Sequence, residues 1–459
     1  MSAAASAAPE PARQRRPGLF RNWRFVALFV AQGASQVAQS AILFTLLILV
    51  LRETDSTFNT SILVFAFITP SLVFGVAAGV LVDRWNKRSV LIYTSLARMV
   101  ACLAYLFFTD DLWPLYVNTV AFSTFSQFFT PAQVALIPSI VRREQLVTAN
   151  GVFNFTLMIS QFAGLVFVAP TLLISLGAEA VFIVTSLLYT VSALAAAALP
   201  DIERGKDFQM PFKELRLLAS IREEVRRGWS LLRSDPVIGL ATAQLTLSAT
   251  LVLLFSILVP RFLRDVLELD PDKAVIVFAP TGIGAIVGLR ALPWLTARMP
   301  RLRVSLLGLL GIAISVFLMA LVEPFGSLLA QWQDIDPFKE DPERLAGLSI
   351  LAAVSMAIAA PIGLSYALVN SPAQTILQER TPPELRGQVF ATQLAIANVV
   401  SILPLLVIGG LTDFIGVSMV LLAIAILIGA SAAGSAWVER RYLPDGRPEE
   451  PEVAPARPV

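Results

Sequence analysis

The sequence predicts an all-α integral membrane protein in which twelve transmembrane helices form two related, pseudo-symmetric six-helix halves. Three observations predict this fold: an apolar composition, twelve long apolar runs, and short motifs that recur in both halves. Of the 459 residues, 56% are hydrophobic and 15% are charged, which is more apolar surface than one water-soluble core can bury. The chain therefore needs the lipid bilayer as its solvent.

Each of the twelve runs is long enough to cross a hydrocarbon core of about 30 Å as a helix. They lie at residues 25–51, 60–82, 89–109, 112–140, 150–174, 177–199, 237–260, 274–296, 303–323, 347–376, 388–412 and 416–438. The first run is too long for the core of a cleaved signal, so the N-terminus is expected to stay in the cytoplasm. Most Lys and Arg residues then fall in inner loops and tails, as the positive-inside rule requires. We expect a multi-pass protein of a bacterial plasma membrane with both termini cytoplasmic.

The segments between and beyond the runs complete the predicted organisation. The expected units are a cytoplasmic tail at 1–24, an N-terminal bundle at 25–200, a cytoplasmic linker at 201–236, a C-terminal bundle at 237–439 and a disordered cytoplasmic tail at 440–459. In the linker, apolar residues recur every three or four positions from Leu218 to Leu232, with arginines on the other faces. This predicts an amphipathic helix that either lies on the inner membrane surface or packs beneath the bundle.

Two short motifs recur at equivalent positions of the two halves. Pro131-Ala132-Gln133 in the fourth run returns as Pro372-Ala373-Gln374 in the tenth. The basic turn after the second run has a weaker counterpart after the eighth, where Ala297 replaces Asp83. Together they favour two six-helix repeats related by an axis along the membrane normal.

Composition also excludes several classes of function. A net charge of +2, with basic residues spread over the loops, argues against a nucleic-acid partner. Histidine is absent and Cys102 is the only cysteine, so we expect no catalytic triad, no metal site, no disulfide and no cofactor. A membrane enzyme acting on lipids would need a cluster of acids, or a nucleophile with its base, near one membrane face, and none is visible. No catalytic residue is therefore assigned.

The turn between the second and third runs is the most informative motif. It reads Gly79-Val-Leu-Val-Asp83-Arg84-Trp-Asn86-Lys87-Arg88. A short turn between membrane helices needs a small residue for close packing, an acid that can face a helix N-terminus, and basic residues that keep it cytoplasmic. This segment resembles the G-x-L-x-D-R-x-x-R/K-R loop of the major facilitator superfamily, a large class of secondary transporters. It departs from that pattern at Asn86, where the family usually has glycine.

Further stretches resemble one branch of that superfamily, which includes macrolide-efflux and enterobactin-exporter proteins. They lie at residues 131–138, 149–150, 225–228 and 377–390. The resemblance implies the major facilitator fold and a monomeric secondary transporter that exports a small molecule, with protons as the expected coupling ion. Substrate identity does not follow, because relatives that share these scaffold motifs carry different cargo.

The resemblance also implies a cytoplasmic gate. In the family, the acid of the loop between helices 2 and 3 docks on the start of helix 11. Here Thr381-Pro382-Pro383-Glu384 reads as a capping box that starts that helix. The predicted gating residues are Gly79, Asp83, Arg84, Lys87, Arg88, Thr381, Glu384 and Arg386. The alternative is that these charges only anchor the loop at the lipid headgroups.

Polar residues inside the runs are the candidates for a substrate cavity. Gln32, Gln36 and Gln39 share one face of the first helix, and an amide without a partner is costly in lipid. In the family, helices 1, 4, 7 and 10 line the central cavity. The predicted cavity residues are Gln32, Gln36, Gln39, Asn118, Phe122, Gln127, Gln244 and Asn370. The alternative is that the amides hold helices together and the phenylalanines face lipid.

Charge inside the runs limits the coupling and the cargo. The core of the runs holds no Asp or Glu, so any proton coupling is expected at an end position such as Glu53 or Asp413, or else the protein is a weakly coupled facilitator. Without a carboxylate to compensate a cation, neutral or anionic amphiphiles are the expected cargo. Arg98 is the one charge deep in a run, and it either bonds to neighbouring polar groups or contacts cargo.

The leading interpretation is therefore an exporter of amphipathic small molecules, of drug, macrolide or siderophore type, that works by a rocker switch of its two halves. A lipid or lysophospholipid flippase-like transporter is the alternative, because it would have the same fold. A membrane-embedded lipid enzyme is the weakest of the three hypotheses.

Overall fold

The structure, a computed structural model, describes residues 19–109, 111–142, 145–201, 235–330, 350–381 and 386–442. The first half contains α1 (Trp23–Thr54), α2 (Thr57–Arg84), α3 (Lys87–Ala104), α4 (Leu112–Ile140), α5 (Leu146–Phe162), the π-helical turn η4 (Ala163–Val168), α6 (Ala169–Leu176) and α7 (Ala178–Ala198). The second half contains α9 (Pro236–Asp265), the 3-10 turn η5 (Pro271–Lys273), α10 (Ala274–Thr296), α11 (Arg301–Ala320), α12 (Val322–Ala330), α13 (Ile350–Arg380), α14 (Arg386–Ile415) and α15 (Val417–Tyr442). Short 3-10 turns η1 (Leu19–Arg21) and η2 (Tyr105–Phe107) flank α1 and α3.

Twelve helical stretches within the described residues are long and apolar enough to cross a membrane. They match the twelve predicted runs, with α5, η4 and α6 together making the fifth span. Prolines inside several of these helices, such as Pro70 in α2 and Pro361 in α13, are compatible with membrane helices because neighbouring groups satisfy the freed carbonyls. The linker 202–234, including its predicted amphipathic helix, and the tail from 443 lie outside the described residues.

The packing of the two halves is related. In the first half α2 packs on α4, α3 packs on both α4 and α7, and α1 packs on α5 and α7. In the second half the equivalent helices make the equivalent pairs: α10 with α13, α11 with α13 and α15, and α9 with α14 and α15. The halves meet through α2 with α14 and, equivalently, η4 with α10. Two copies of one six-helix arrangement therefore build the bundle.

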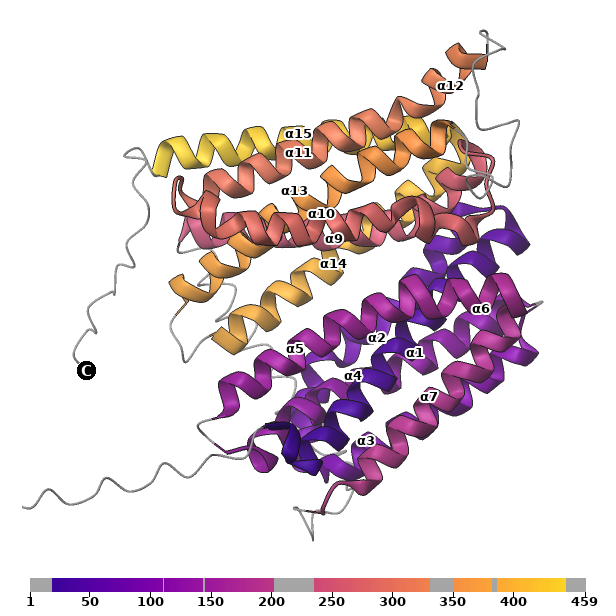
Figure 1. Ribbon diagram of the computed structural model, residues 1–459, viewed down its shortest axis with the longest axis vertical. Helices are drawn as coiled ribbons and strands as arrows, with labels where there is room; N and C mark the ends of the chain where they lie inside the picture. Colours follow the sequence, from indigo (N-terminus) through magenta and orange to yellow (C-terminus); the bar gives the residue numbers. More distant parts are fainter. Residues whose placement is uncertain are drawn as a thin grey trace, which may run out of the picture.

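Figure 1 shows the two sets of helices close together at the end where α6 lies and diverging toward the end where α15 finishes. We call the first the Asp55 end, because it carries the α1–α2 turn, and the second the Asn86 end, because it carries the α2–α3 turn. The two ends differ in how they join the halves, and this difference defines the site described below.

Close approach of α10 and α13 depends on glycine. A Cβ atom on Gly284 would overlap the Ala360 carbonyl oxygen, and one on Gly363 would overlap the Thr281 carbonyl oxygen. Small residues allow helix backbones to approach closely where lipid supplies no hydrophobic driving force for association. This contact holds the two helices that form a wall of the cavity described below.

Gly284→Ala is expected to destabilise the protein by about 1–3 kcal/mol, because the added methyl group cannot be accommodated without separating α10 from α13. Thermal unfolding in detergent should show a melting temperature lower by several degrees. Gly429→Ala is the matched control, since a Cβ there meets nothing within 4 Å. Equal melting temperatures for the two variants would contradict the close contact.

Candidate functional site

The α1–α2 turn at the Asp55 end is built from two residues. Asp55 takes a left-handed conformation (φ 49°) and its N–H donates to the Leu51 carbonyl, which ends α1. Ser56 follows as the N-cap of α2 and accepts from the backbone N–H of Asn59. Aspartate tolerates this backbone conformation better than most residues other than glycine. The tight turn presents the Asp55 carboxylate to the second half.

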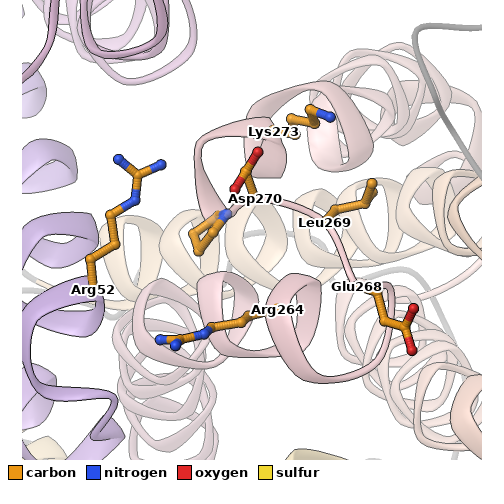
Figure 2. A pocket seen from close by; sticks show the side chains of 7 residues that line it. Arg52, Arg264, Glu268, Leu269, Asp270 and Lys273 are labelled. Atoms are coloured by element: carbon orange, nitrogen blue, oxygen red, sulfur yellow. The ribbon is translucent and has the colours of Figure 1, made fainter. Parts of the chain in front are cut away.

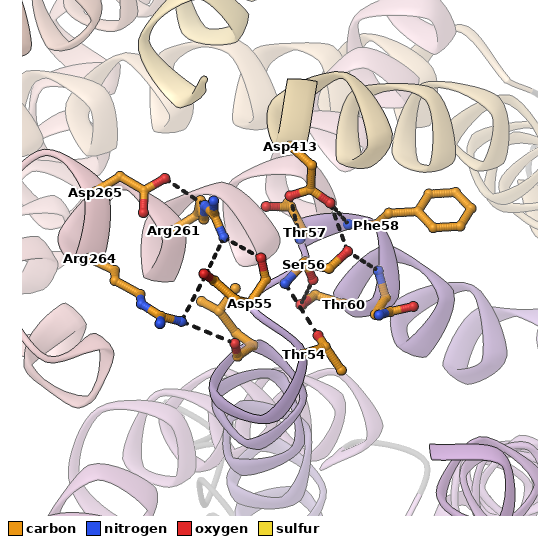
Figure 3. Close-up of polar contacts among 12 residues, drawn as sticks. Thr54, Asp55, Ser56, Thr57, Phe58, Thr60, Arg261, Arg264, Asp265 and Asp413 are labelled. Carbon is orange, nitrogen blue, oxygen red and sulfur yellow. Dashed lines mark hydrogen bonds and ion pairs between the residues drawn. The ribbon is translucent and has the colours of Figure 1, made fainter. Parts of the chain in front are cut away.

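Arg261, near the end of α9, binds this turn across the boundary between the halves (Figure 3). Its Nη1 donates to both the carbonyl and the Oδ1 of Asp55, each at 2.7 Å. Its Nε donates to Asp265 Oδ2 at 2.6 Å, one turn away on the same helix. Arg264 adds an ion pair to Asp55 at 3.0 Å. One arginine held by its own helix thus contacts both a charge and a backbone carbonyl of the other half.

Asp413, near the end of α14, caps the N-terminus of α2. Its carboxylate accepts from the N–H groups of Thr57 at 2.7 Å and Phe58 at 3.0 Å, and from the Ser56 hydroxyl at 2.7 Å. The first N–H groups of a helix have no partner within it, and they carry its positive partial charge. Gly409, one turn earlier on α14, lies so close to α2 that a Cβ would overlap the Ser61 hydroxyl. The two helices therefore join the halves by contact and by charge.

An ion pair makes a third contact between the halves at the Asp55 end. Arg52 of α1 donates to Asp272 of η5 at 2.6 Å. Beside it lies a polar pocket of about 410 Å³, which Arg52 approaches from the first half and the remaining lining residues from the second (Figure 2). The pocket is lined by Arg52, Arg264, Glu268, Leu269, Asp270, Pro271 and Lys273. Three basic and two acidic side chains line it, and two of them, Arg52 and Arg264, also form ion pairs across the boundary of the halves. We call the contacts of Arg52, Asp55, Arg261, Arg264, Asp272 and Asp413 the Asp55 gate.

A larger cavity, of about 450 Å³, lies between the halves. The first half contributes Phe44 and Leu47 of α1 and the segment that runs from α5 into η4. The second half contributes the other walls, from α9, α10, α11, α13 and α15. Its lining carries no charged side chain and is rich in phenylalanine. A cavity with these walls suits an apolar or amphipathic molecule.

Four of the predicted cavity residues make contacts inside their own half. Gln32 is buried and donates to the Phe153 carbonyl of α5 at 3.1 Å. Asn118 donates to the Ala101 carbonyl of α3 at 2.9 Å, and Gln244 accepts from the Ser305 hydroxyl at 2.7 Å. Phe122 is fully buried among the aromatic rings of Phe67, Tyr105 and Tyr189. These contacts match the alternative in which such residues join helices.

The other four predicted cavity residues are half-buried. Gln36 and Gln39 make no hydrogen bond with another described residue, and the Gln127 amide lies 3.5 Å from the Ser123 carbonyl of its own helix. Asn370 donates to the Tyr366 hydroxyl at 3.1 Å and accepts from Gln374 at 2.8 Å. Tyr366 lines the apolar cavity, so Asn370 is one residue removed from it.

Arg98 lies wholly inside the first half. Its side chain is 0% exposed, and it donates to the Ser35 hydroxyl at 2.9 Å and the Thr94 carbonyl at 3.2 Å. Its guanidinium carbon lies 4.1 Å from the Phe129 ring centroid and 4.6 Å from that of Tyr189. Two ring faces and two oxygen atoms stabilise the cation where lipid surrounds the bundle. In this structure, the Arg98 hydrogen bonds are therefore made to groups of its own half.

Comparison with known proteins decides the family. A family model described as Major Facilitator Superfamily matches residues 28–403. The chain belongs to this superfamily. It is 24% identical over 440 residues to the MFS-type transporter YfiS of Bacillus subtilis, covering 93% of this chain and 97% of that protein. It is 23% identical over 413 residues to macrolide efflux protein A of Streptococcus pyogenes, covering 87% and 92%.

Solved structures agree on the fold. The crystal structure of the nucleoside transporter NupG matches with a TM-score of 0.68 at 12% identity, covering 90% of this chain and 98% of that one. The predicted fold of twelve spans in the major facilitator arrangement is confirmed, and so is the prediction of a transporter in place of an enzyme. The protein is a multi-pass secondary transporter of small molecules.

The superfamily's loop between the second and third helices lies at the Asn86 end. Asn86 is the N-cap of α3, where it accepts from the Ser89 N–H at 3.1 Å and donates to Asp201 at 2.7 Å. Asparagine is thus suited to a position where the family usually has glycine. Arg88 donates to the Ala197 carbonyl at 2.6 Å, which ties the loop to α7.

The proposed docking of this loop on α14 lies beyond what the structure describes. Gly79 is half-buried in α2, Lys87 is buried in the first turn of α3, and Thr381 is buried after α13. The side chains of Asp83, Arg84 and Arg386 and the whole of Glu384 are outside the described residues. The cytoplasmic gate therefore stays a prediction.

The two candidate coupling acids have different surroundings. Glu53 is exposed near the end of α1 and makes no hydrogen bond with another described side chain. Asp413 holds three hydrogen bonds in the Asp55 gate. A proton on Asp413 would remove the negative charge that faces the α2 N-terminus and would weaken this contact between the halves.

The Asp55 gate itself was missed by reasoning on the sequence, except for Asp413. A signal was present in the sequence, because Arg261 and Arg264 follow the seventh run at the end predicted to face outward, where the positive-inside rule disfavours them. Their exceptional position indicates a specific partner. Which acid they bind follows only from the packing of the two halves.

Asp55→Asn is expected to increase about fivefold the population of conformers whose halves are separated at the Asp55 end. The reason is that it removes roughly 1 kcal/mol of ionic contact with Arg261 and Arg264. Asparagine keeps the left-handed turn. The shift can be measured as longer electron-spin distances between labels attached through Glu179→Cys and Glu323→Cys in a Cys102→Ala background. Asp265→Asn is the matched control, because it removes a partner of the same arginine within one half. The same distances in both variants would refute the gate.

Proposed function

We propose that this transporter exports neutral or anionic amphipathic small molecules by alternating access, with its Asp55 end facing outward and both termini in the cytoplasm. The observation that carries the proposal is the apolar cavity shared by the two halves, which lies below a closed ionic gate. Similarity to a macrolide efflux protein over most of both chains favours export over import. We place it as a monomer in the plasma membrane; membership of the superfamily and twelve apolar helices support the membrane location.

The switch between states follows from the arrangement of α2 and α14. These helices run antiparallel along the boundary of the halves, and in this state Asp413 at the end of α14 caps the start of α2. Asp83, in the last turn of α2, is the counterpart that would cap the start of α14 when the Asn86 end closes. Each carboxylate stabilises one closed end, so rocking the halves exchanges one helix cap for the other.

The interior excludes strongly charged cargo. Among the described residues, Arg98 is the one charged side chain buried in the middle of a span, and it is enclosed by Phe129, Tyr189 and Ser35. Moving a permanent cation into such surroundings is costly without a carboxylate. A neutral molecule, or an anion that keeps its charge at the wetter end of the cavity, meets no such barrier.

A lysophospholipid-like cargo is the second candidate, and the cavity wall supports it. Phe162 and Leu165 line the cavity, are 43% and 38% exposed, and lie where η4 of the first half meets α10 of the second. An acyl chain could therefore enter from the membrane between η4 and α10. Flipping of a fluorescent lysophospholipid in liposomes that contain the purified protein tests this candidate separately.

Expression in a bacterial strain stripped of its drug pumps is expected to lower the accumulation of neutral Nile red severalfold while leaving accumulation of the cation ethidium unchanged. The neutral interior is the physical reason. An empty vector is the control, and a protonophore tests whether protons drive the export. Vigorous export of ethidium with no effect on Nile red would overturn the proposed cargo class.

Asp83→Asn is expected to leave expression unchanged and to reduce Nile red export severalfold, because a helix-end interaction of about 0.3–2 kcal/mol shifts a near-balanced equilibrium. Loss of this cap should favour the state that is closed at the Asp55 end. Initial export rates normalised to protein in the membrane provide the measurement. Normal export by a well-expressed variant would exclude the cytoplasmic cap, and the alternative of a loop anchored at the headgroups would stand.

A further inference from the structure

The lining of the apolar cavity includes three polar side chains. Its polar side chains are Ser256, Thr281 and Tyr366, and Ser256 donates to the Leu253 carbonyl of its own helix at 2.6 Å. Its volume of about 450 Å³ falls within the range of roughly 300–1,000 Å³ that small-molecule sites occupy. The remaining lining is aliphatic, aromatic or glycine, so most of a bound molecule would meet only apolar surface. Tyr366 is the side chain there that is placed to give specificity.

Tyr366 ends a ladder of polar side chains along one face of α13. Ile362, Tyr366, Asn370 and Gln374 are spaced four residues apart and so lie on the same side of the helix. Gln374 Nε2 donates to Asn370 Oδ1 at 2.8 Å, and Asn370 Nδ2 donates to Tyr366 Oη at 3.1 Å. The ladder begins at the exposed Gln374 toward the Asn86 end and stops at the cavity.

The direction of these hydrogen bonds leaves one donor unused. Tyr366 Oη accepts from Asn370, and no described residue accepts the proton of the Tyr366 hydroxyl. A phenolic hydroxyl can donate one hydrogen bond while it accepts another. Acceptance from Asn370 also polarises the O–H bond and makes it a better donor. A bound molecule with an oxygen acceptor would satisfy it.

We infer that the cavity holds the apolar body of the exported molecule and that Tyr366 donates a hydrogen bond to an uncharged or anionic oxygen acceptor next to that body. The inference rests on the proposed function and narrows its substrate class. Ile362, one turn nearer the Asp55 end, contacts the apolar body, and the amides of Asn370 and Gln374 lie on the opposite, polar side of Tyr366. Carbonyl, ester, ether and carboxylate groups satisfy Tyr366; a plain hydrocarbon does not.

Both halves are needed to complete this site. Phe44 and Leu47 of α1, with Phe162 and Leu165, close the wall opposite α13. The Asp55 gate holds those helices against the second half in this state. Separation of the halves at the Asp55 end would therefore open the apolar wall, while Tyr366 stays on α13. Release of the molecule is thereby linked to the movement that opens the gate.

Binding to the full-length purified protein in detergent tests the inference without transport. Two photoactivatable probes are used: a long-chain methyl ketone that carries a diazirine, and the matching hydrocarbon without the carbonyl group. The ketone is expected to bind about threefold to tenfold more tightly, the effect of one net hydrogen bond. Its labels should lie in the segments of α9 and α13 that line the cavity, as mapped by mass spectrometry.

Tyr366→Phe is expected to lower the binding affinity for the ketone by the same threefold to tenfold and to leave the affinity for the hydrocarbon unchanged. Tyr93→Phe is the matched control, because Tyr93 is 65% exposed on α3. Unchanged ketone affinity in Tyr366→Phe, or labels confined to lipid-facing residues, would overturn the inference. The ring is retained in this variant, so its packing against the cavity is preserved.

Ile362→Trp provides a second, independent variant. It fills the cavity and should abolish labelling of the cavity segments by both probes, whereas Ile314→Trp, on an exposed position of α11, should not. Persistent cavity labelling in Ile362→Trp would overturn the placement of the apolar body. If the protein binds the probes as expected but exports nothing, the result contradicts the proposed function and not this inference. If the protein exports Nile red but is never labelled in the cavity, the result contradicts this inference and not the proposed function.

Discussion

The absence of water from the hydrocarbon core is the constraint on which this structure depends. A polar group there is costly unless it finds a partner inside the protein or faces a water-filled cavity, so charges collect at the two ends of the bundle and the middle is nearly neutral. Arg98 shows what an exception requires: a backbone carbonyl of its own helix, together with a hydroxyl and two aromatic faces from α1, α4 and α7. The same constraint places the gate at the ends, since ionic contacts between the halves can form and separate only where water reaches them.

Helix ends are central to this arrangement. An N-terminus presents several N–H groups without partners, and a carboxylate from the other half satisfies them only when the halves are close. Asp413 does this for α2, and the contact is reinforced by the approach that Gly409 allows. A gate of this kind is strong when closed yet leaves no buried charge when open, because water replaces the carboxylate at the exposed helix end.

The sequence was sufficient to predict the spans, their order and the two related halves, because hydropathy and loop charge are local properties. It was not sufficient for the residues between helices. The amides of Gln32 and Gln244 looked alike as cavity candidates, but each has a partner in its own half that no spacing rule reveals. The sequence does not single out Tyr366, because a lone tyrosine in an apolar run has no distinctive pattern, although Asn370 and Gln374 follow it at four-residue intervals. Pairing of Arg261 with Asp55 joins positions 206 residues apart and depends on how the halves dock.

The separation of gate from cavity explains how one scaffold can serve different cargo. The contacts at the ends join the halves, and none of the Asp55 gate residues is among the residues that line the cavity. Under the proposed function, substitutions in the cavity lining can therefore alter the cargo while the gate residues stay the same. Shape and one hydrogen-bond donor, in place of charge, then decide which molecules are accepted. Such a site would accept apolar bodies of many shapes but would select more strictly for the position of the oxygen acceptor. The reason is that a buried hydrogen-bond donor without an acceptor costs more binding free energy than an imperfect apolar fit.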